Sequence, residues 1–219
     1  MLDSWLNKTK LRLKIERFVE KRFYGRFSPN QLTVLGLILG LLSAVLIFLS
    51  GIITEIPFLL IIIACILMSL SFLFDVFDGA LARVEEPTIF GGIFDIFCDR
   101  LVEVSIIIAI ISTDPLSLMW PGIFLLGAII ICITMFLAVG GAIKLERINE
   151  TKKVIYYRKG LMERSETFLF LLLITLIFFG PWRCILLWIF TILVFLTGVL
   201  RLRDAYLILR KPKQEKKNL

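Results

Sequence analysis

Four aspartates lie in otherwise apolar sequence between residues 72 and 99: Asp75, Asp78, Asp95 and Asp99. A carboxylate in such surroundings is destabilising unless a cation lies nearby, so this stretch is the first place to look for chemistry. The chain has no histidine, and oxygen-only ligands suit the hard cations Mg²⁺ and Mn²⁺. Four carboxylates can hold two such ions, an arrangement that stabilises phosphoryl displacement. Arg83, close to the aspartates, adds a planar donor fork suited to a phosphate.

The composition indicates a membrane protein. Of 219 residues, 58% are hydrophobic, and the mean hydropathy of +0.92 is far above that of a soluble domain. The net charge of +7 is then better explained by basic cytoplasmic loops than by nucleic-acid binding. The cysteines do not have the CxxC spacing of a zinc site, and a disulfide framework is not expected either; they are Cys65, Cys98, Cys132 and Cys184.

The apolar sequence divides into six segments, each near the ~20 residues that cross a bilayer as a helix. The expected spans are Gln31–Ile53, Phe58–Arg83, Phe90–Ser112, Leu118–Lys144, Glu163–Phe179 and Trp182–Arg203. Six spans place 24 of the 25 lysines and arginines on one face, and Arg183 alone on the other. By the positive-inside rule that face is cytoplasmic. We therefore expect a multi-pass protein of the cell membrane with both termini in the cytoplasm.

Two segments flank the six spans. Residues 1–27 are basic, but Leu11, Ile15 and Phe18 recur at helical spacing, which predicts an amphipathic helix at the membrane surface. Residues 206–219 form a basic, polar cytoplasmic tail. The predicted fold is an all-α integral membrane protein, with a six-helix domain at 28–205 and an N-terminal interfacial helix.

In this topology the second and third spans form a hairpin that opens to the cytoplasm. Asp75 and Asp78 are three residues apart and Asp95 and Asp99 are four apart, so each pair shares one face of its helix. All four carboxylates are expected to converge in one cytoplasmic pocket. Glycines within the stretch, such as Gly79, would let a ligand or the backbone approach closely.

These residues resemble a known family. The pattern Asp75-x2-Asp78-Gly79-x2-Ala82-Arg83-x7-Gly91-x3-Asp95-x3-Asp99 is similar to the signature of the class I CDP-alcohol phosphotransferases, or CDP-alcohol phosphatidyltransferases. The resemblance covers roughly residues 25 to 205, including the Ser28-Pro29-Asn30 start of the first span. It implies transfer of a phosphatidyl-type or archaetidyl group from a CDP-linked lipid to an alcohol, with release of CMP.

The resemblance also implies roles for individual residues. Asp75, Asp78, Asp95 and Asp99 would bind two divalent cations, Mg²⁺ or Mn²⁺, and Asp99 would also be the catalytic base. Contacts to the CDP moiety are implied for Asn30, Thr33, Asp75, Gly79, Ala82, Arg83 and Thr88. Members of the family commonly form homodimers.

The acceptor alcohol is less defined. Lys144 and Arg164 are expected at helix ends on the side of the metal pocket, where they would hold a phosphate on the acceptor. Residues 160–166 resemble members that use inositol phosphate, but Thr167 stands where those members typically carry another arginine. Inositol phosphate is therefore slightly favoured as the acceptor over glycerol phosphate or serine. The same chemistry with a soluble CDP-inositol as the donor also remains open.

Two other functions are consistent with buried aspartates. A cation transporter would use them as an ion site, but it gives no role to Arg83 and predicts a polar path across the bilayer. The outer halves of the spans are almost wholly apolar. A prenyltransferase with two aspartate-rich motifs would have its motifs further apart, in a longer chain.

Overall fold

The computed structural model is all-helical over the residues it describes, which confirms the predicted all-α class. It describes residues 10–53, 55–85, 87–149, 164–178 and 180–209, with side chains for 14–53, 55–85, 87–141, 164–178 and 180–207. The helices are α2 (Lys10–Phe23), α3 (Pro29–Ile52), α4 (Pro57–Glu85), α5 (Ile89–Thr113), α6 (Pro115–Asn149), α7 (Arg164–Leu176) and α8 (Trp182–Leu209).

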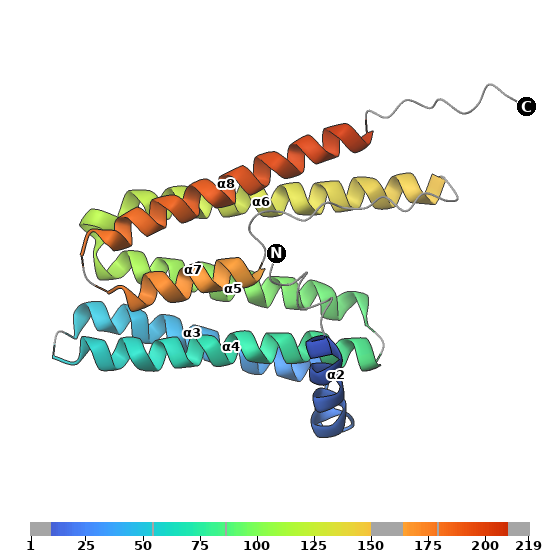
Figure 1. Cartoon of the computed structure of the whole chain (residues 1–219), viewed down its shortest axis with the longest axis horizontal. Helices are drawn as coiled ribbons and strands as arrows, with labels where there is room; N and C mark the ends of the chain where they lie inside the picture. The colour runs from blue at the N-terminus through green and yellow to red at the C-terminus, as the bar shows by residue number, and fades with distance from the viewer. Residues whose placement is uncertain (1–9, 54, 86, 150–163, 179, 210–219) are drawn as a thin grey trace, which may run out of the picture.

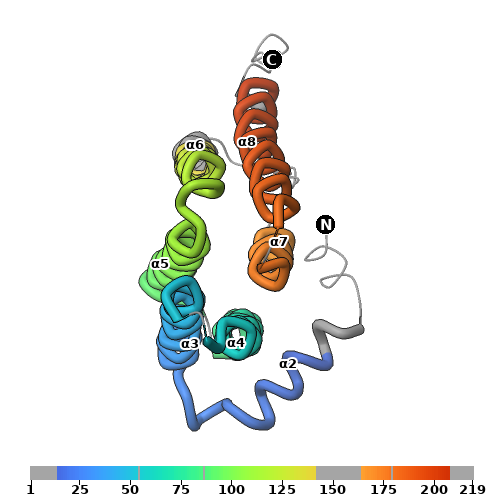
Figure 2. The backbone as a smooth tube through the Cα atoms, turned by 90° about the vertical axis from the view of Figure 1, so that its left-hand side faces the viewer, coloured from blue at the N-terminus to red at the C-terminus, as the bar shows by residue number. Residues whose placement is uncertain are grey.

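The helices from α3 onward lie side by side and alternate in direction (Figure 1). Seen along the bundle, α3 and α4 form one pair and α6 and α8 another, with α5 and α7 between them (Figure 2). The end of α4 and the start of α5 lie at one end of the bundle. This arrangement brings the two aspartate-bearing helices into the hairpin that the sequence predicts.

Four of these helices are long and apolar enough to cross a membrane: α3, α4, α6 and α8. Helix α5 has the length of a span, but it carries Asp95, Asp99, Arg100 and Glu103. Helix α7 has 13 residues. The membrane character of the fold is therefore clear, whereas the count of six spans stays a prediction.

Helix α3 packs closely against both aspartate-bearing helices. A Cβ atom added at Gly40 would lie 2.5 Å from Cγ1 of Val102 on α5 and 3.0 Å from Oγ of Ser71 on α4. The Ser71 hydroxyl also donates a hydrogen bond to the carbonyl of Gly36 at 2.7 Å. Small residues let helix backbones approach in this way in membrane proteins. As a result, α3 holds α4 and α5 in register beside the site.

The start of α3 is fixed by its own capping residues. The Ser28 hydroxyl accepts from the Gln31 backbone N–H at 3.3 Å, and the Gln31 side chain accepts from the Ser28 N–H at 2.9 Å. This reciprocal pair is a capping box, and Pro29 occupies the first turn, where no N–H is needed. The sequence-predicted helix start after residue 28 is confirmed.

Candidate active site

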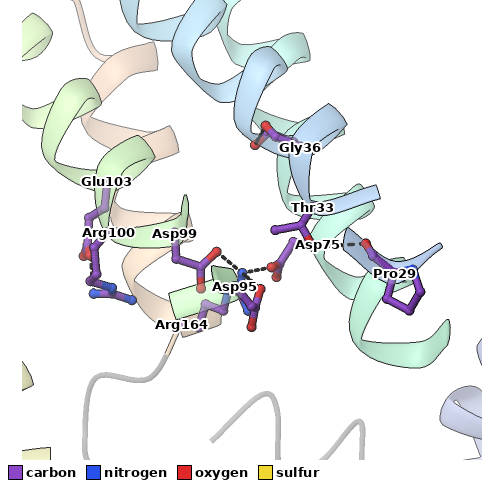
Figure 3. Close-up of polar contacts among 10 residues, drawn as sticks. Pro29, Thr33, Gly36, Asp75, Asp95, Asp99, Arg100, Glu103 and Arg164 are labelled. Carbon is purple, nitrogen blue, oxygen red and sulfur yellow. Dashed lines mark hydrogen bonds and ion pairs between the residues drawn. The ribbon is translucent and has the colours of Figure 1, made fainter. Parts of the chain in front are cut away.

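Three aspartates from two helices form a tight cluster. Asp75 on α4 and Asp95 and Asp99 on α5 each offer a carboxylate oxygen, and these oxygens lie within 4.8 Å of one another. Figure 3 shows the three side chains converging from facing helices. Their side chains are largely buried, with 14% of Asp75, 33% of Asp95 and 20% of Asp99 exposed.

The fourth aspartate lies in the same pocket but outside this cluster. Asp78 is 4% exposed and lines a cavity of about 90 Å³ together with Asp75 and Asp99. The expectation that all four carboxylates converge is thus only partly met, because Asp78 shares the cavity with Asp75 and Asp99 but does not belong to the cluster of closely spaced oxygens. Its Oδ2 atom and Oδ1 of Asp95 are buried without a hydrogen-bond partner in the described structure.

A cationic side chain occupies the middle of the cluster. Arg164, the first residue of α7, forms ion pairs with Asp75 and Asp99, and its Nη2 lies 3.7 Å from Oδ1 of Asp95 (Figure 3). Carboxylates at this depth require positive charge, and here a guanidinium from a third helix supplies it. The sequence predicts Arg164 on this side of the bundle but not its contact with the aspartates.

The donor set fits a divalent cation. Closely spaced carboxylate oxygens, without histidine or thiolate, are typical of Mg²⁺ and Mn²⁺ sites. Two of the available oxygens, Oδ2 of Asp78 and Oδ1 of Asp95, are buried and accept no hydrogen bond in the described structure. Asp75, Asp78, Asp95 and Asp99 together therefore have the chemistry to hold such ions.

Aromatic and polar groups close the cavity around the aspartates. The rings of Phe72 and Phe168 stack at 4.3 Å between centroids, which joins α4 to α7 beside the site. Thr33 of α3 also lines the cavity, and its hydroxyl donates to the Pro29 carbonyl at 3.1 Å (Figure 3). Thr33, one of the predicted CDP-contacting residues, is therefore next to the aspartates.

Two other predicted CDP contacts lie where α3 meets α5. Thr88 is the N-cap of α5, and its hydroxyl accepts from the Gly91 N–H at 3.0 Å. A Cβ atom at Gly91 would lie 3.3 Å from Oδ1 of Asn30 and 2.8 Å from Oγ1 of Thr88. Glycine at this position thus allows the two polar side chains to approach the backbone.

The remaining predicted contacts follow Asp78 on α4. Gly79 leaves open space beside the helix, where an added Cβ would meet only Nη1 of Arg83, at 3.6 Å. Ala82 is half-buried, and Arg83 at the helix end is exposed. The Nε of Arg83 lies 3.0 Å from Oε1 of Glu16 on α2. This link to the N-terminal helix is not predictable from the sequence.

A second cavity, of about 190 Å³, adjoins the aspartate cluster. Asp99, Arg100 and Arg164 line both cavities, and Arg201 contributes further positive charge to the second. Arg201 on α8 donates to the Cys132 carbonyl at 3.0 Å, and its guanidinium lies over the Phe136 ring at 5.1 Å. The cavity brings together three arginines from three helices.

Acidic side chains moderate this charge. Arg100 forms an ion pair with Glu103 one turn along α5, and Glu103 also lines the second cavity.

The other residue predicted to bind the acceptor, Lys144, has a side chain outside the described residues.

In the sequence, Arg201 counts only as one of the basic residues that define the cytoplasmic side. A sequence feature that indicates its contact with α6 is Gly198, which lies one turn before it. A Cβ atom at Gly198 would be 3.6 Å from Cα of Cys132, so glycine here allows α8 to approach α6 closely. The close approach brings Arg201 to the Cys132 carbonyl.

Comparison with known proteins identifies the family of the chain. Residues 26–199 match the CDP-alcohol phosphatidyltransferase family profile. The chain is 31% identical over 194 residues to the inner membrane protein YnjF of Escherichia coli strain K12, covering 86% of this chain and 87% of YnjF. The fold is similar to that of Mycobacterium tuberculosis phosphatidylinositol phosphate synthase (PgsA1), solved with CDP-DAG bound. The TM-score is 0.68 at 17% identity, over 88% of this chain and 93% of the other.

The family match extends over most of the chain and includes every aspartate of the cluster. Apolar helices and an inner-membrane relative agree on the location. The chain belongs to the CDP-alcohol phosphatidyltransferase family, and it is accordingly a membrane-bound transferase of phospholipid biosynthesis.

Proposed function

We propose that this enzyme transfers a phosphatidyl-type group from a CDP-linked lipid to a phosphorylated alcohol, releasing CMP. The observation that carries the proposal is the junction of the two cavities. Asp99 and Arg164 line both the aspartate pocket and the arginine-lined cavity. A donor in the first cavity and an acceptor in the second would therefore meet at Asp99.

The donor side is supported by residues that suit a nucleotide diphosphate. Thr33, Asn30 and Thr88 offer neutral hydrogen-bonding groups, and Arg83 offers a planar fork for a phosphate. Gly79 and Ala82 keep the adjacent face of α4 free of large side chains. The similar M. tuberculosis fold was solved with CDP-DAG bound, which supports a CDP-linked lipid here.

The acceptor side is supported by the charge of the second cavity. Arg100, Arg164 and Arg201 face a space of about 190 Å³, and guanidinium groups bind phosphates through paired hydrogen bonds. We favour inositol phosphate among phosphorylated acceptors, because residues 160–166 resemble members that use it. The similar M. tuberculosis enzyme is named for a product with a phosphorylated inositol headgroup.

In the proposed reaction, Asp99 accepts the proton of the acceptor hydroxyl as its oxygen attacks the lipid-linked phosphorus. The bond from that phosphorus to the CMP oxygen breaks, and CMP leaves from the opposite side. Divalent cations, Mg²⁺ or Mn²⁺, held by Asp75, Asp78, Asp95 and Asp99 would stabilise the charge that builds on the phosphoryl oxygens. Arg164 and Arg201 orient the acceptor by its phosphate.

The proposed topology places this chemistry at the cytoplasmic face. Six spans with both termini inside sort 24 of the 25 lysines and arginines to that side. Helix α2 crosses the bundle axis at the end of the bundle that holds the site, as an interfacial helix would (Figure 1). We further propose a homodimer, on family resemblance.

A cation transporter is the alternative from another class. It predicts a path of polar residues across the bilayer, whereas the outer halves of the spans are almost wholly apolar. A transporter would move Mn²⁺ into sealed liposomes without any CDP-lipid.

The proposed function is tested by CMP release from purified protein. The donor would be CDP-diacylglycerol or its isoprenoid-ether analogue, with Mg²⁺, Mn²⁺ or EDTA, and inositol phosphate, glycerol phosphate, inositol or serine as acceptors. We expect CMP release only with a divalent cation and a phosphorylated acceptor. Release with serine or free inositol would overturn the acceptor assignment, and no release with any acceptor would overturn the proposed reaction.

A further inference from the structure

The geometry points to Glu16 of the N-terminal helix α2 as a positioning residue for Arg83. In this inference, Glu16 holds the guanidinium so that its two terminal nitrogens face the pyrophosphate of the CDP-linked lipid. It rests on the proposed function, because it assigns a role in donor binding. It adds a functional contribution from a segment that lies outside the aspartate-bearing hairpin.

The contact involves only the Nε atom of the Arg83 guanidinium. Oε1 of Glu16 lies 3.0 Å from Nε of Arg83, with good hydrogen-bond geometry. The Nη1 atom instead lies beside Gly79, 3.6 Å from where a Cβ would stand, one turn closer to the aspartates. Glu16 therefore binds the Nε–H and leaves Nη1 beside Gly79, the residue that follows Asp78.

Helix α2 is itself packed firmly enough to hold Glu16 in place. Val19, one turn after Glu16, is 0% exposed and packs in a cluster with Leu32, Ala80 and Leu81. The rings of Phe23 and Phe77 lie 5.8 Å apart, which adds a second contact between α2 and α4. These contacts surround the helix end that carries Arg83.

The physical reason for such a partner lies in the exposure of Arg83. Its side chain is 45% exposed, at the end of α4, and a long exposed side chain has many rotamers to lose when it binds a ligand. A partly buried carboxylate, 22% exposed, that fixes the Nε–H reduces this loss in advance. Glu16 would then increase donor affinity without touching the donor.

The test is Glu16→Gln in the full-length enzyme. We expect the KM for the CDP-linked lipid to rise about 2- to 5-fold, the scale of an exposed ion pair. The dissociation constant of CDP should rise in parallel, while kcat and the KM for the acceptor stay near wild type. The matched control is Glu20→Gln, exposed one turn further along the same helix, which should change none of these values. A purely structural defect would lower kcat or active protein without separating the two KM values.

A double-mutant cycle with Arg83→Lys tests the coupling, because lysine has no Nε–H equivalent for Glu16 to hold. We expect Glu16→Gln to have no further effect in that background. Equal effects in both backgrounds, or an unchanged donor KM in Glu16→Gln, would overturn the inference. If the wild type releases no CMP from CDP-lipid, the proposed function fails instead, so the two failures are distinguishable.

Discussion

Arg164 on α7 donates to the carboxylate of Asp99 on α5, joining residues 65 positions apart in the chain. The same guanidinium pairs with Asp75 on α4, so one side chain links three helices at the site. It also lines the second cavity, where the acceptor is proposed to bind. In the proposed reaction, Arg164 thus has two sets of partners, the aspartates and an acceptor phosphate.

Replacing Arg164 by glutamine separates these two partners. We expect the KM for a phosphorylated acceptor to rise about tenfold or more, because a charge-assisted hydrogen bond is lost. The Mn²⁺ concentration for half-maximal activity should fall, because a competing cation leaves the carboxylates. Initial rates titrated separately with acceptor and Mn²⁺ measure both effects. A higher Mn²⁺ requirement in this variant would contradict the competition.

Arg201 and Arg203 form a matched pair for testing the second cavity. Arg201 lines it, whereas Arg203 is 56% exposed and lies 3.6 Å from Asp204. Arg201→Gln should raise the KM for the phosphorylated acceptor about tenfold and leave the KM for CDP-lipid unchanged. Arg203→Gln should leave both unchanged. Equal effects of the two substitutions would mean that the cavity does not bind the acceptor.

Asp99→Asn tests the proposed base. The amide keeps the shape of the side chain but cannot accept the proton, so turnover should fall about 10²- to 10⁴-fold while CDP binding is largely retained. Single-turnover CMP release and CDP binding by calorimetry separate the two. Glu55→Gln, at an exposed position between α3 and α4, is the control. Turnover near wild type in Asp99→Asn would remove Asp99 from the base role.

The convergence of aspartates from α4 and α5 could be predicted from sequence, because the two helices are consecutive spans and helical spacing decides which aspartates share a face. Asp75, Asp95 and Asp99 follow that rule directly. The divergence of Asp78 could not be predicted, since it depends on the rotation of α4 against α5. Composition also predicts that α3 is long and apolar enough to cross a membrane. It does not predict this for α5, because that helix carries several charged residues.

Contacts between distant helices were not predictable in the same way. The sequence predicts Arg201 only as one more cytoplasmic charge, and it predicts Arg164 at the acceptor phosphate but not in contact with the aspartates. Hydropathy and charge counts contain no information about neighbours on other helices. The Glu16–Arg83 pair joins residues 67 positions apart and depends on the angle at which α2 crosses α4 (Figure 1). Only the folded arrangement of the helices brings these side chains together.

Gly40 is predicted to be essential for packing rather than for chemistry. Its missing Cβ would lie 2.5 Å from the branched side chain of Val102, which has little freedom to move. Gly40→Ala should therefore destabilise the protein by about 1–3 kcal/mol, measured as a lower Tm in detergent. Gly127→Ala, with no atom within 4 Å of the added Cβ, should not lower the Tm. Equal Tm values for both variants would contradict the close approach of α3 and α5.

The most direct test of the central claim is the position of Mn²⁺ in crystals of the enzyme soaked with Mn²⁺ and CDP, located by anomalous scattering. The account predicts Mn²⁺ bound by carboxylate oxygens of Asp75, Asp95 and Asp99, with Arg164 withdrawn toward Arg201. No Mn²⁺ among these aspartates, in crystals of protein that releases CMP from CDP-lipid, would contradict it.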